Sequence, residues 1–178
     1  MILIIKLCKQ KMHNLEFVKP IRDILKKNYI KYITIFYKEV NKKILLDVDK
    51  VIISGTSLFD NDFAKNSSYF HWIKKFKKPI LGICGGFQIL GLIYNGNRIK
   101  SKKIGLSKIK FYKEFLGLEG EIEVYELHNY SIHSNDYEIY AISDKCPEAI
   151  KHKNLPFYGV LFHPEVRNKD MIINFTNL

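Results

Sequence analysis

The stretch "KPILGICGGFQILG", residues 78–91, decides the fold of this chain. Its first part, "PILGI" (79–83), is an apolar run of strand length, and "GGFQILGLIY" (85–94) follows at once as a helix. The turn between them reads Gly-Ile-Cys-Gly-Gly over 82–86, which has the form G-x-nucleophile-x-G. Glycines flank such a turn because its strained backbone and the close helix–strand approach leave little room for a Cβ atom. The pattern predicts a strand-to-helix elbow that exposes Cys84 above the sheet.

Strands and helices alternate on both sides of this elbow in the first half of the chain. Apolar runs of strand length predict strands at 1–7, 32–37, 50–55 and 79–83. Helices are expected at 13–27, with Pro20 near the helix start, at 67–76 after a serine cap, and at 85–94. Continuous apolar strands separated by helices are typical of a parallel sheet that is covered by helices on both faces.

The pattern changes after Gly96. Short strands are expected at 104–112, 121–127, 137–143 and 157–162, and a last helix at about 168–176. The sequence therefore predicts an α/β fold with a doubly wound, mostly parallel central sheet flanked by helices, flavodoxin-like in arrangement, with an antiparallel extension in the C-terminal half. A chain of 178 residues suits one buried core, so we expect a single domain over 1–178.

The cysteines favour a reducing compartment. Cys8, Cys84 and Cys146 are odd in number, lie far apart, and show no C-x-x-C or Cys/His ligand spacing. Neither a disulfide framework nor a zinc site is supported, and no metal or cofactor is expected. The amino end of the helix that follows Cys84 favours the reactive thiolate, which a structural cysteine would not need.

The net charge of the chain and its N-terminal segment indicate which partners and which cellular location to expect. The net charge of +11 raises the question of nucleic-acid binding, but the lysines are spread along the chain. The densest clusters, at 74–78 and 100–103, match no usual nucleic-acid motif and are interpreted as solvated faces. The opening is apolar for only about five residues, too few for a signal segment or a membrane span. We expect a soluble cytoplasmic protein.

A nucleophile needs a base, and the base needs an orienting group. The stretch "YGVLFHPEV" (158–166) supplies both, because an apolar strand ends in His163 and Glu165 follows two positions later. Pro164 fixes the backbone between them. In an extended stretch the two side chains can lie on the same side, so Glu165 can hold one imidazole nitrogen while the other faces the sulfur. Each residue alone could be an ordinary surface group, but the combination with the elbow favours a catalytic set.

Together the two stretches resemble the class I glutamine amidotransferase family, whose glutaminase domains carry a G-x-C-x-G-x-Q elbow and a later F-H-P-E. The motifs stand in the family's order, and the resemblance covers nearly the whole chain. It implies that Cys84 attacks the side-chain amide carbon of glutamine, that His163 moves the protons, and that Glu165 orients His163.

The same resemblance implies which residues hold the substrate. Gln88, one helical turn beyond the cysteine, matches the family position that helps to bind glutamine. The segment "ELHNYSIH" is similar to a short H-S-Y or N-H-G stretch of the family. Asn129 and Tyr130 are therefore candidates for gripping the α-amino and α-carboxylate groups. His128 and His133 are interpreted as structural or surface residues.

The oxyanion of the reaction needs hydrogen-bond donors. One is expected to be the Gly85 N–H at the helix start. The other, by resemblance, comes from the loop after the strand at 50–55, where relatives commonly read S-G-G-P or S-N-G-P. This chain reads Ser-Gly-Thr-Ser over 54–57, so Gly55 and Thr56 are the candidates. If the loop required a positive φ at Thr56, the β-branched residue would be strained, and Thr56→Gly would raise the rate of the isolated chain.

The resemblance also implies that the ammonia goes to a separate synthetase or synthase subunit. No Walker-type G-x-x-x-x-G-K-[ST] and no S-G-G-x-D-S loop occurs in the sequence, so the acceptor site is expected on another chain. Two alternatives stay open at this point. One is a partner-independent γ-glutamyl hydrolase of the same fold, and the other is a non-enzymatic basic module that binds nucleic acid.

Overall fold

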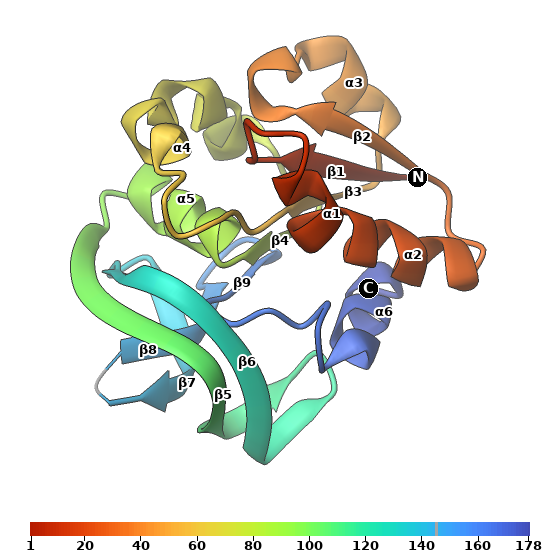
Figure 1. The fold of residues 1–178 in the computed structure, drawn as a ribbon. Coiled ribbons are helices and arrows are strands. Elements are labelled where there is room, and N and C mark those ends of the chain that lie inside the picture. The colour runs from red at the N-terminus through yellow and green to blue at the C-terminus, as the bar shows by residue number, and fades with distance from the viewer. Residues whose placement is uncertain (145) are drawn as a thin grey trace.

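A computed structural model describes residues 1–144 and 146–178, and one sheet runs through its centre (Figure 1). The strands are β1 (Ile2–Lys6), β2 (Tyr32–Phe36), β3 (Lys50–Ile53), β4 (Ile80–Ile83), β5 (Asn97–Phe115), β6 (Leu118–His133), β7 (Tyr137–Ser143), β8 (Cys146–His152) and β9 (Phe157–Val160). They lie in the order β2-β1-β3-β4-β9-β8-β7-β5-β6. Pairing is parallel from β2 to β9 and antiparallel from β9 to β6. The predicted fold class is confirmed.

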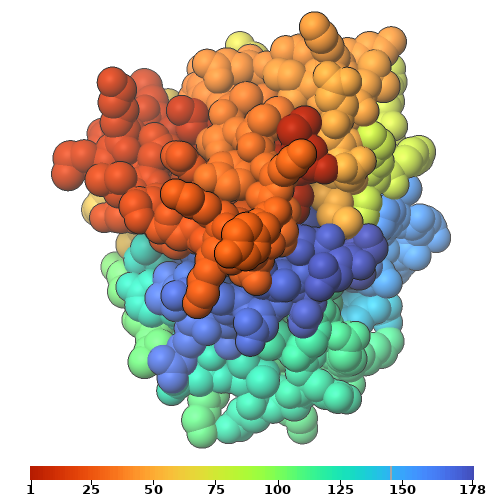
Figure 2. All heavy atoms as spheres, turned by 90° about the vertical axis from the view of Figure 1, so that its right-hand side faces the viewer, coloured from red at the N-terminus to blue at the C-terminus, as the bar shows by residue number. Residues whose placement is uncertain are grey.

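Helices cover both faces of the parallel half. They are α1 (His13–Phe17), α2 (Lys19–Lys27), α3 (Lys42–Asp47), α4 (Asp62–Lys65), α5 (Gly85–Ile93) and α6 (Lys169–Thr176), with 3₁₀ helices η1 (Tyr37–Glu39) and η2 (Ser67–Lys75). Figure 1 shows α1, α2 and α6 on one side of the sheet and α4 and α5 on the other. In Figure 2 the segment that contains α2 lies beside the C-terminal α6.

Two cores result, one on each face of the sheet. Alternation along β1 illustrates the division, because side chains of a strand point to opposite faces in turn. Ile2 and Ile4 belong to the core that includes α2 and α6, whereas Leu3 and Ile5 belong to the core that includes α5 and η2. Strands buried on both faces carry the continuous apolar runs from which the parallel sheet was predicted.

The carboxyl ends of three neighbouring parallel strands bring the chemical motifs together. β3, β4 and β9 are adjacent and point the same way. The loop over 54–57 follows β3, Cys84 follows β4, and His163 comes soon after β9. Ligands of open α/β sheets bind at this edge, outside the carboxyl ends of the strands.

Several element boundaries differ from the expectation. The helix expected at 13–27 is divided into α1 and α2, with Pro20 in the first turn of α2. The segment at 67–75 is a 3₁₀ helix, and its buried Phe70 and Ile73 have the three-residue spacing that eclipses on such a helix. The helices α3 and α4 were not predicted.

Two strands after Gly96 were predicted too short, whereas β7 has the expected bounds and β9 ends two residues before the expected 162. β5 has 19 residues and β6 has 16, and they pair along most of their length as a two-stranded ribbon. A register shift between Lys100 and Lys103 interrupts the pairing. The alternation of side chains expected of a strand is lost at this point, although the strand continues on both sides of it. The prediction missed β8, in which Pro147 suggests a loop but which pairs between β7 and β9.

No helix among the residues described is both long and apolar enough to cross a membrane.

Candidate active site

Cys84 sits in a strained backbone conformation at the start of α5. Its φ is 48° and its ψ is −95°, a region that residues other than glycine rarely occupy. The Cys84 N–H donates to the Val160 carbonyl at 2.8 Å, and the Cys84 carbonyl accepts from the Gln88 N–H at 3.1 Å. These bonds to β9 and to the first turn of α5 hold the elbow in place. Such strain, held by its surroundings, is typical of a functional position.

The glycines that flank Cys84 are required because there is no space for a side chain at their positions. A Cβ at Gly82 would lie 2.6 Å from the backbone of Gly86, and a Cβ at Gly86 would lie 2.3 Å from the Ile53 carbonyl oxygen. Backbone atoms cannot move away as a flexible side chain can. The strand and the helix therefore approach so closely that only glycine fits, as the sequence pattern predicted.

His163 and Glu165 form a buried pair beside the elbow. The His163 Nδ1 lies 2.7 Å from Glu165 Oε1, and both side chains are almost fully buried. The His163 N–H donates to the Tyr125 carbonyl at 2.8 Å, which ties the segment to β6. The Phe17 ring of α1 covers the imidazole at 5.5 Å between centroids. The imidazole is thus fixed by a carboxylate at one nitrogen and packed against an aromatic ring.

Opposing effects set the charge of this imidazole. Burial lowers the pKa of His163, but the nearby Glu165 carboxylate and Cys84 more than offset it and raise the pKa well above 6.5. The Nε2 atom makes no hydrogen bond to any described residue. The imidazole therefore keeps one nitrogen free beside Cys84, where it can accept or donate a proton.

Gly55 shows how closely the groups meet. A Cβ built on Gly55 would lie 2.6 Å from His163 Cε1 and 3.5 Å from Cys84 Cβ. The loop after β3 is therefore in contact with both the imidazole and the cysteine, and a side chain at Gly55 would push the imidazole away. The structure thus brings Cys84, His163, Glu165 and Gly55 together.

The Gly55 carbonyl is directed toward Ser54 and Cys8. It accepts hydrogen bonds from Ser54 Oγ at 2.9 Å and from Cys8 Sγ at 3.6 Å. In a trans peptide the C=O and the following N–H point in opposite directions, and no cis peptide occurs among the described residues. The Thr56 N–H therefore points away from Cys8 and has no hydrogen-bond acceptor in the described chain.

The expectation of strain at Thr56 is not met. Thr56 is absent from the described residues with positive φ, so its backbone lies outside the region that would strain a β-branched residue. The Thr56 Cγ2 would touch a Cβ on Gly85 at 3.4 Å, which shows that Thr56 packs on the amino end of α5. The prediction that Thr56→Gly raises activity by relieving strain therefore loses its physical basis.

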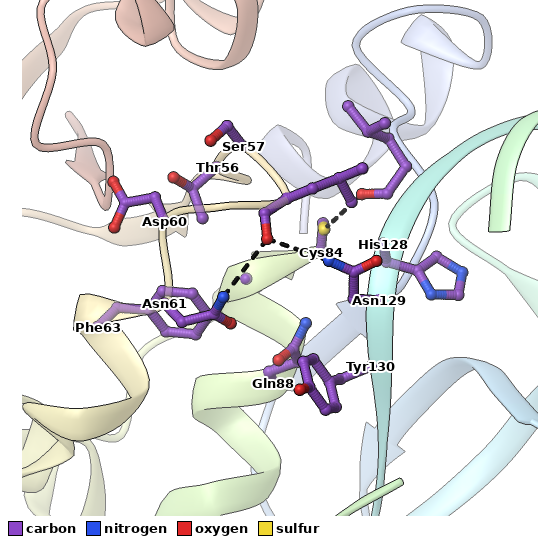
Figure 3. Close-up of a pocket in the computed structure, with 13 residues that line it drawn as sticks. Thr56, Ser57, Asp60, Asn61, Phe63, Cys84, Gln88, His128, Asn129 and Tyr130 are labelled. Atoms are coloured by element: carbon purple, nitrogen blue, oxygen red, sulfur yellow. Dashed lines mark hydrogen bonds between the residues drawn. The ribbon is translucent and has the colours of Figure 1, made fainter. Parts of the chain in front are cut away.

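A pocket opens next to Cys84 (Figure 3). Its walls are the loop after β3, the first turn of α5 and the middle of β6; they include Thr56, Ser57, Leu58, Asp60, Asn61, Phe63, Cys84, Gly85, Gln88, Leu127, His128, Asn129 and Tyr130. Gln88, Asn129 and Tyr130, the expected substrate-binding residues, all line it. The Cys84 thiol donates to the Leu127 carbonyl at 3.4 Å.

The pocket is nearly closed. Its volume is about 20 Å³, enough for one water molecule but not for an amino acid. Leu58 lines the pocket, and its carbonyl accepts from the Asn129 amide at 3.1 Å and from the Asn61 amide at 3.4 Å, so it joins two walls. The Gln88 Oε1 is buried and has no partner among the described residues. A substrate would have to displace Leu58, and Gln88 would then offer it a free acceptor.

His128 lies in a separate buried network. Its ring points away from Cys84 (Figure 3) and its two nitrogens lie 2.7 Å from Ser101 O and 2.7 Å from Glu126 Oε2. Ser101 belongs to the irregular part of β5, so His128 satisfies a carbonyl that strand pairing leaves free. This position agrees with the structural interpretation of His128.

Sequence reasoning missed residues at the rim of the pocket. Asn61 belongs to the loop before α4, and Arg98 belongs to β5, where its guanidinium lies 4.0 Å from the centroid of the Tyr130 ring. Neither residue is part of a motif. Only their position after the loop and the elbow helix could have suggested them.

Comparisons with known proteins agree with this geometry. The family model described as "Glutamine amidotransferase class-I" matches residues 14–176. The glutamine-hydrolyzing GMP synthase subunit of Picrophilus torridus is 32% identical over 146 residues, which are 77% of this chain and 78% of that protein. The corresponding subunit of Pyrococcus furiosus is 34% identical over 140 residues, covering 72% and 74% of the two chains.

A solved structure shares the fold. The crystal structure of a putative GMP synthase subunit from Thermoplasma acidophilum matches with a TM-score of 0.87 and 24% identity, covering 99% of this chain and 92% of that chain. From the matched family model and these relatives, the chain belongs to the class-I glutamine amidotransferase family.

Proposed function

We propose that this chain is a glutaminase subunit that hydrolyses glutamine to glutamate and ammonia and delivers the ammonia to a separate synthase subunit. The observation that carries the proposal is the strained Cys84 beside the buried His163–Glu165 pair. A nucleophile, a base and an orienting carboxylate in contact are the arrangement needed for covalent hydrolysis of an amide. Family membership identifies the amide as that of glutamine.

The reaction proceeds through a thioester. The Cys84 thiolate adds to the side-chain amide carbon of glutamine, and the carbonyl oxygen becomes an oxyanion. Ammonia leaves as His163 donates a proton to the nitrogen, and the C–N bond breaks. Water then attacks the γ-glutamyl thioester while His163 accepts its proton, and glutamate leaves. Glu165 acts through His163, because it holds the imidazole orientation and stabilises its charged form.

Two backbone donors serve the oxyanion. The Gly85 N–H lies at the start of α5, where helical N–H groups have no acceptor within the helix. The Thr56 N–H, which has no hydrogen-bond acceptor in the described chain and belongs to a residue that lines the pocket, is the second donor. Removing one such donor typically costs about 3–4 kcal/mol of transition-state stabilisation. Gln88, Asn129 and Tyr130 hold the substrate.

The ammonia acceptor lies on another chain. Relatives that share about a third of their residues with this one are named as glutamine-hydrolyzing GMP synthase subunits, so we infer that the partner is the subunit that forms GMP. The small volume of the pocket supports control by a partner, because glutamine fits only after the Leu58 carbonyl moves from its bonds to Asn129 and Asn61. Docking of the partner would favour the open pocket if the partner bound that state more tightly.

Glutamate release tests the proposal. The purified chain with and without the GMP-forming subunit should release glutamate in proportion to the chain present, faster with the partner, and Cys84→Ala should abolish release. Cys146→Ala is the matched control and should keep the activity, because Cys146 begins β8 in the antiparallel half. Hydrolysis of γ-glutamyl peptides at a rate equal to that of glutamine, unaffected by the partner, would instead support the γ-glutamyl hydrolase.

A further inference from the structure

The charged guanidinium of Arg98 lies at the rim of the pocket beside Cys84. Its guanidinium lies 4.0 Å from the centroid of the Tyr130 ring, and its Nη2 donates to Asn61 Oδ1 at 2.9 Å. Tyr130 comes from β6 and Asn61 from the loop after β3, and both line the pocket (Figure 3). The guanidinium therefore connects two opposite walls of the site.

The charge of Arg98 has no counter-ion. No carboxylate of the described residues lies within the 4.0 Å of an ion pair with it, and its Nε is buried without a hydrogen-bond partner. Burial lowers the pKa of Arg98, which shows that the surroundings disfavour the charge. Among the described lining residues Asp60 is the acidic one, and it accepts from the Lys9 N–H and the Asp62 N–H. A half-buried cation of this kind would be stabilised by an anionic ligand.

We propose that Arg98 recognises the α-carboxylate of the glutamine substrate and so selects free amino acids with an open α-carboxylate; this rests on the proposed function. Glutamine bound with its amide carbon at Cys84 extends roughly 5 Å to its α-carboxylate, by ordinary bond lengths. Asn61 and Tyr130 line the same pocket as Cys84, and Arg98 contacts both, so we place that end of the molecule beside Arg98. A guanidinium binds a carboxylate through two parallel hydrogen bonds, which a lysine cannot form.

The same contact explains how the pocket opens. Arg98 donates a hydrogen bond to Asn61, and Asn61 donates one to the carbonyl of Leu58, a residue that lines the pocket. A carboxylate that binds Arg98 replaces Asn61 Oδ1 as the acceptor and releases the loop. Substrate recognition at the rim thereby frees the space that the substrate needs.

Binding to a variant that cannot form the thioester tests this inference. On a Cys84→Ala background, calorimetry should measure the affinity for L-glutamine and for its α-amide, which lacks the carboxylate charge. We expect the parent background to prefer glutamine by roughly 10- to 100-fold, the worth of a good charged hydrogen-bond pair. Arg98→Gln should remove this preference, and Arg98→Lys should restore part of it.

The control is Lys110→Gln, which removes one exposed positive charge from the same strand β5 and should leave the preference intact. Chemical unfolding of each variant should establish that it is folded. An Arg98→Gln variant that keeps the preference, or that weakens both ligands by the same factor, would overturn the inference and leave Arg98 as a structural link between Asn61 and Tyr130.

Failure of the two proposals can be told apart. If the native chain with its partner releases glutamate but Arg98→Gln keeps its preference, the function stands and the role of Arg98 is wrong. If glutamine binds in an Arg98-dependent way but no glutamate is released, the role of Arg98 stands and the proposed function is wrong. If neither ligand binds at millimolar concentration, the role of Arg98 is wrong.

Discussion

At the scale of single residues, each side chain of the proposed catalytic set has its own role. In the proposed mechanism Cys84 reacts with the substrate, His163 moves protons, and Glu165 acts only through the imidazole that it contacts at 2.7 Å. The His163 pKa is raised because Glu165 and Cys84 offset the effect of burial. Loss of the carboxylate would leave a buried imidazole that prefers to be neutral.

His163→Ala and Glu165→Gln are therefore expected to differ. His163→Ala should remove nearly all thioester formation, whereas Glu165→Gln should keep a residual rate about 10²- to 10⁴-fold below that of the native chain. Glu165→Gln also lowers the His163 pKa, so its residual reactivity toward a glutamine-analogue electrophile should lie at a different pH from that of the native chain. Pre-steady-state kinetics over a pH series would measure both. Native rates in both variants would refute the catalytic set.

Some features of the substrate and oxyanion site could be predicted from the sequence, and others could not. The glycines at 82–86 were predicted because they form a short continuous motif, although the group that excludes a side chain at Gly86 is Ile53 of the neighbouring strand β3. The strain expected at Thr56 was wrong, because φ depends on how the loop leaves β3, which only the three-dimensional contacts fix. Arg98 was missed for the same reason, since its partners Asn61 and Tyr130 are 37 and 32 residues away in sequence.

At the scale of elements, the elbow depends on close packing of β3, β4 and α5. Gly86→Ala should destabilise the protein by about 3 kcal/mol, the upper range for overpacking, because the new Cβ would meet the Ile53 carbonyl at 2.3 Å. It should also abolish labelling of Cys84. Gly120→Ala is the control: Gly120 has φ +71° but open space around it, so only backbone strain of about 1–2 kcal/mol is expected and labelling should persist. Urea unfolding and mass spectrometry measure both, and equal labelling would contradict the packing argument.

A buried charge network links β5, β6 and β8. Lys103 lies 3.7 Å from Glu126 and 3.4 Å from Glu148, and Ser143 contacts both Lys103 and Glu148. Burial, together with the charge of Glu126, raises the Glu148 pKa from 4.5 to about 8. The folded state therefore holds a proton on Glu148 that the unfolded chain loses at lower pH. The stability that this proton contributes is full below pH 4.5 and is lost as the pH rises through 8.

Glu148→Gln should flatten this dependence, because glutamine resembles the protonated acid. The native chain should lose on the order of 3 kcal/mol of unfolding free energy relative to the variant between about pH 5 and pH 9. Urea titrations at several pH values measure the difference. A gap between the two proteins that stays constant with pH would show that Glu148 is ionised in the folded state.

At the scale of the whole molecule, the order of strands and helices followed from the sequence, whereas the extent of the antiparallel half did not. Parallel strands buried on both faces carry continuous apolar runs, so each of them could be predicted. β8 was missed because Pro147 is more typical of a loop than of a strand. In the structure β8 pairs with β7 on one side and with β9 on the other. The β5–β6 ribbon was predicted too short because the irregular pairing between Lys100 and Lys103 hides its continuity.

The sheet places the three cysteines in different surroundings, and only those of Cys84 suit the proposed nucleophile. Cys84 lies where β4 meets α5, beside His163. Cys8 follows β1 at the same edge, but burial and the Asp60 charge raise its pKa to about 11, so it stays a thiol at neutral pH. Cys146 begins β8 in the antiparallel half, away from the elbow.

Peptide mapping after treatment with a glutamine-analogue electrophile tests the central claim most directly. The chain should be labelled with and without saturating glutamine, and each cysteine-containing peptide should be quantified by mass spectrometry. The proposed nucleophile predicts modification of Cys84, slowed by glutamine, with Cys8 and Cys146 largely untouched. Faster labelling of Cys8 or Cys146 than of Cys84, or labelling of Cys84 that glutamine does not slow, would contradict it.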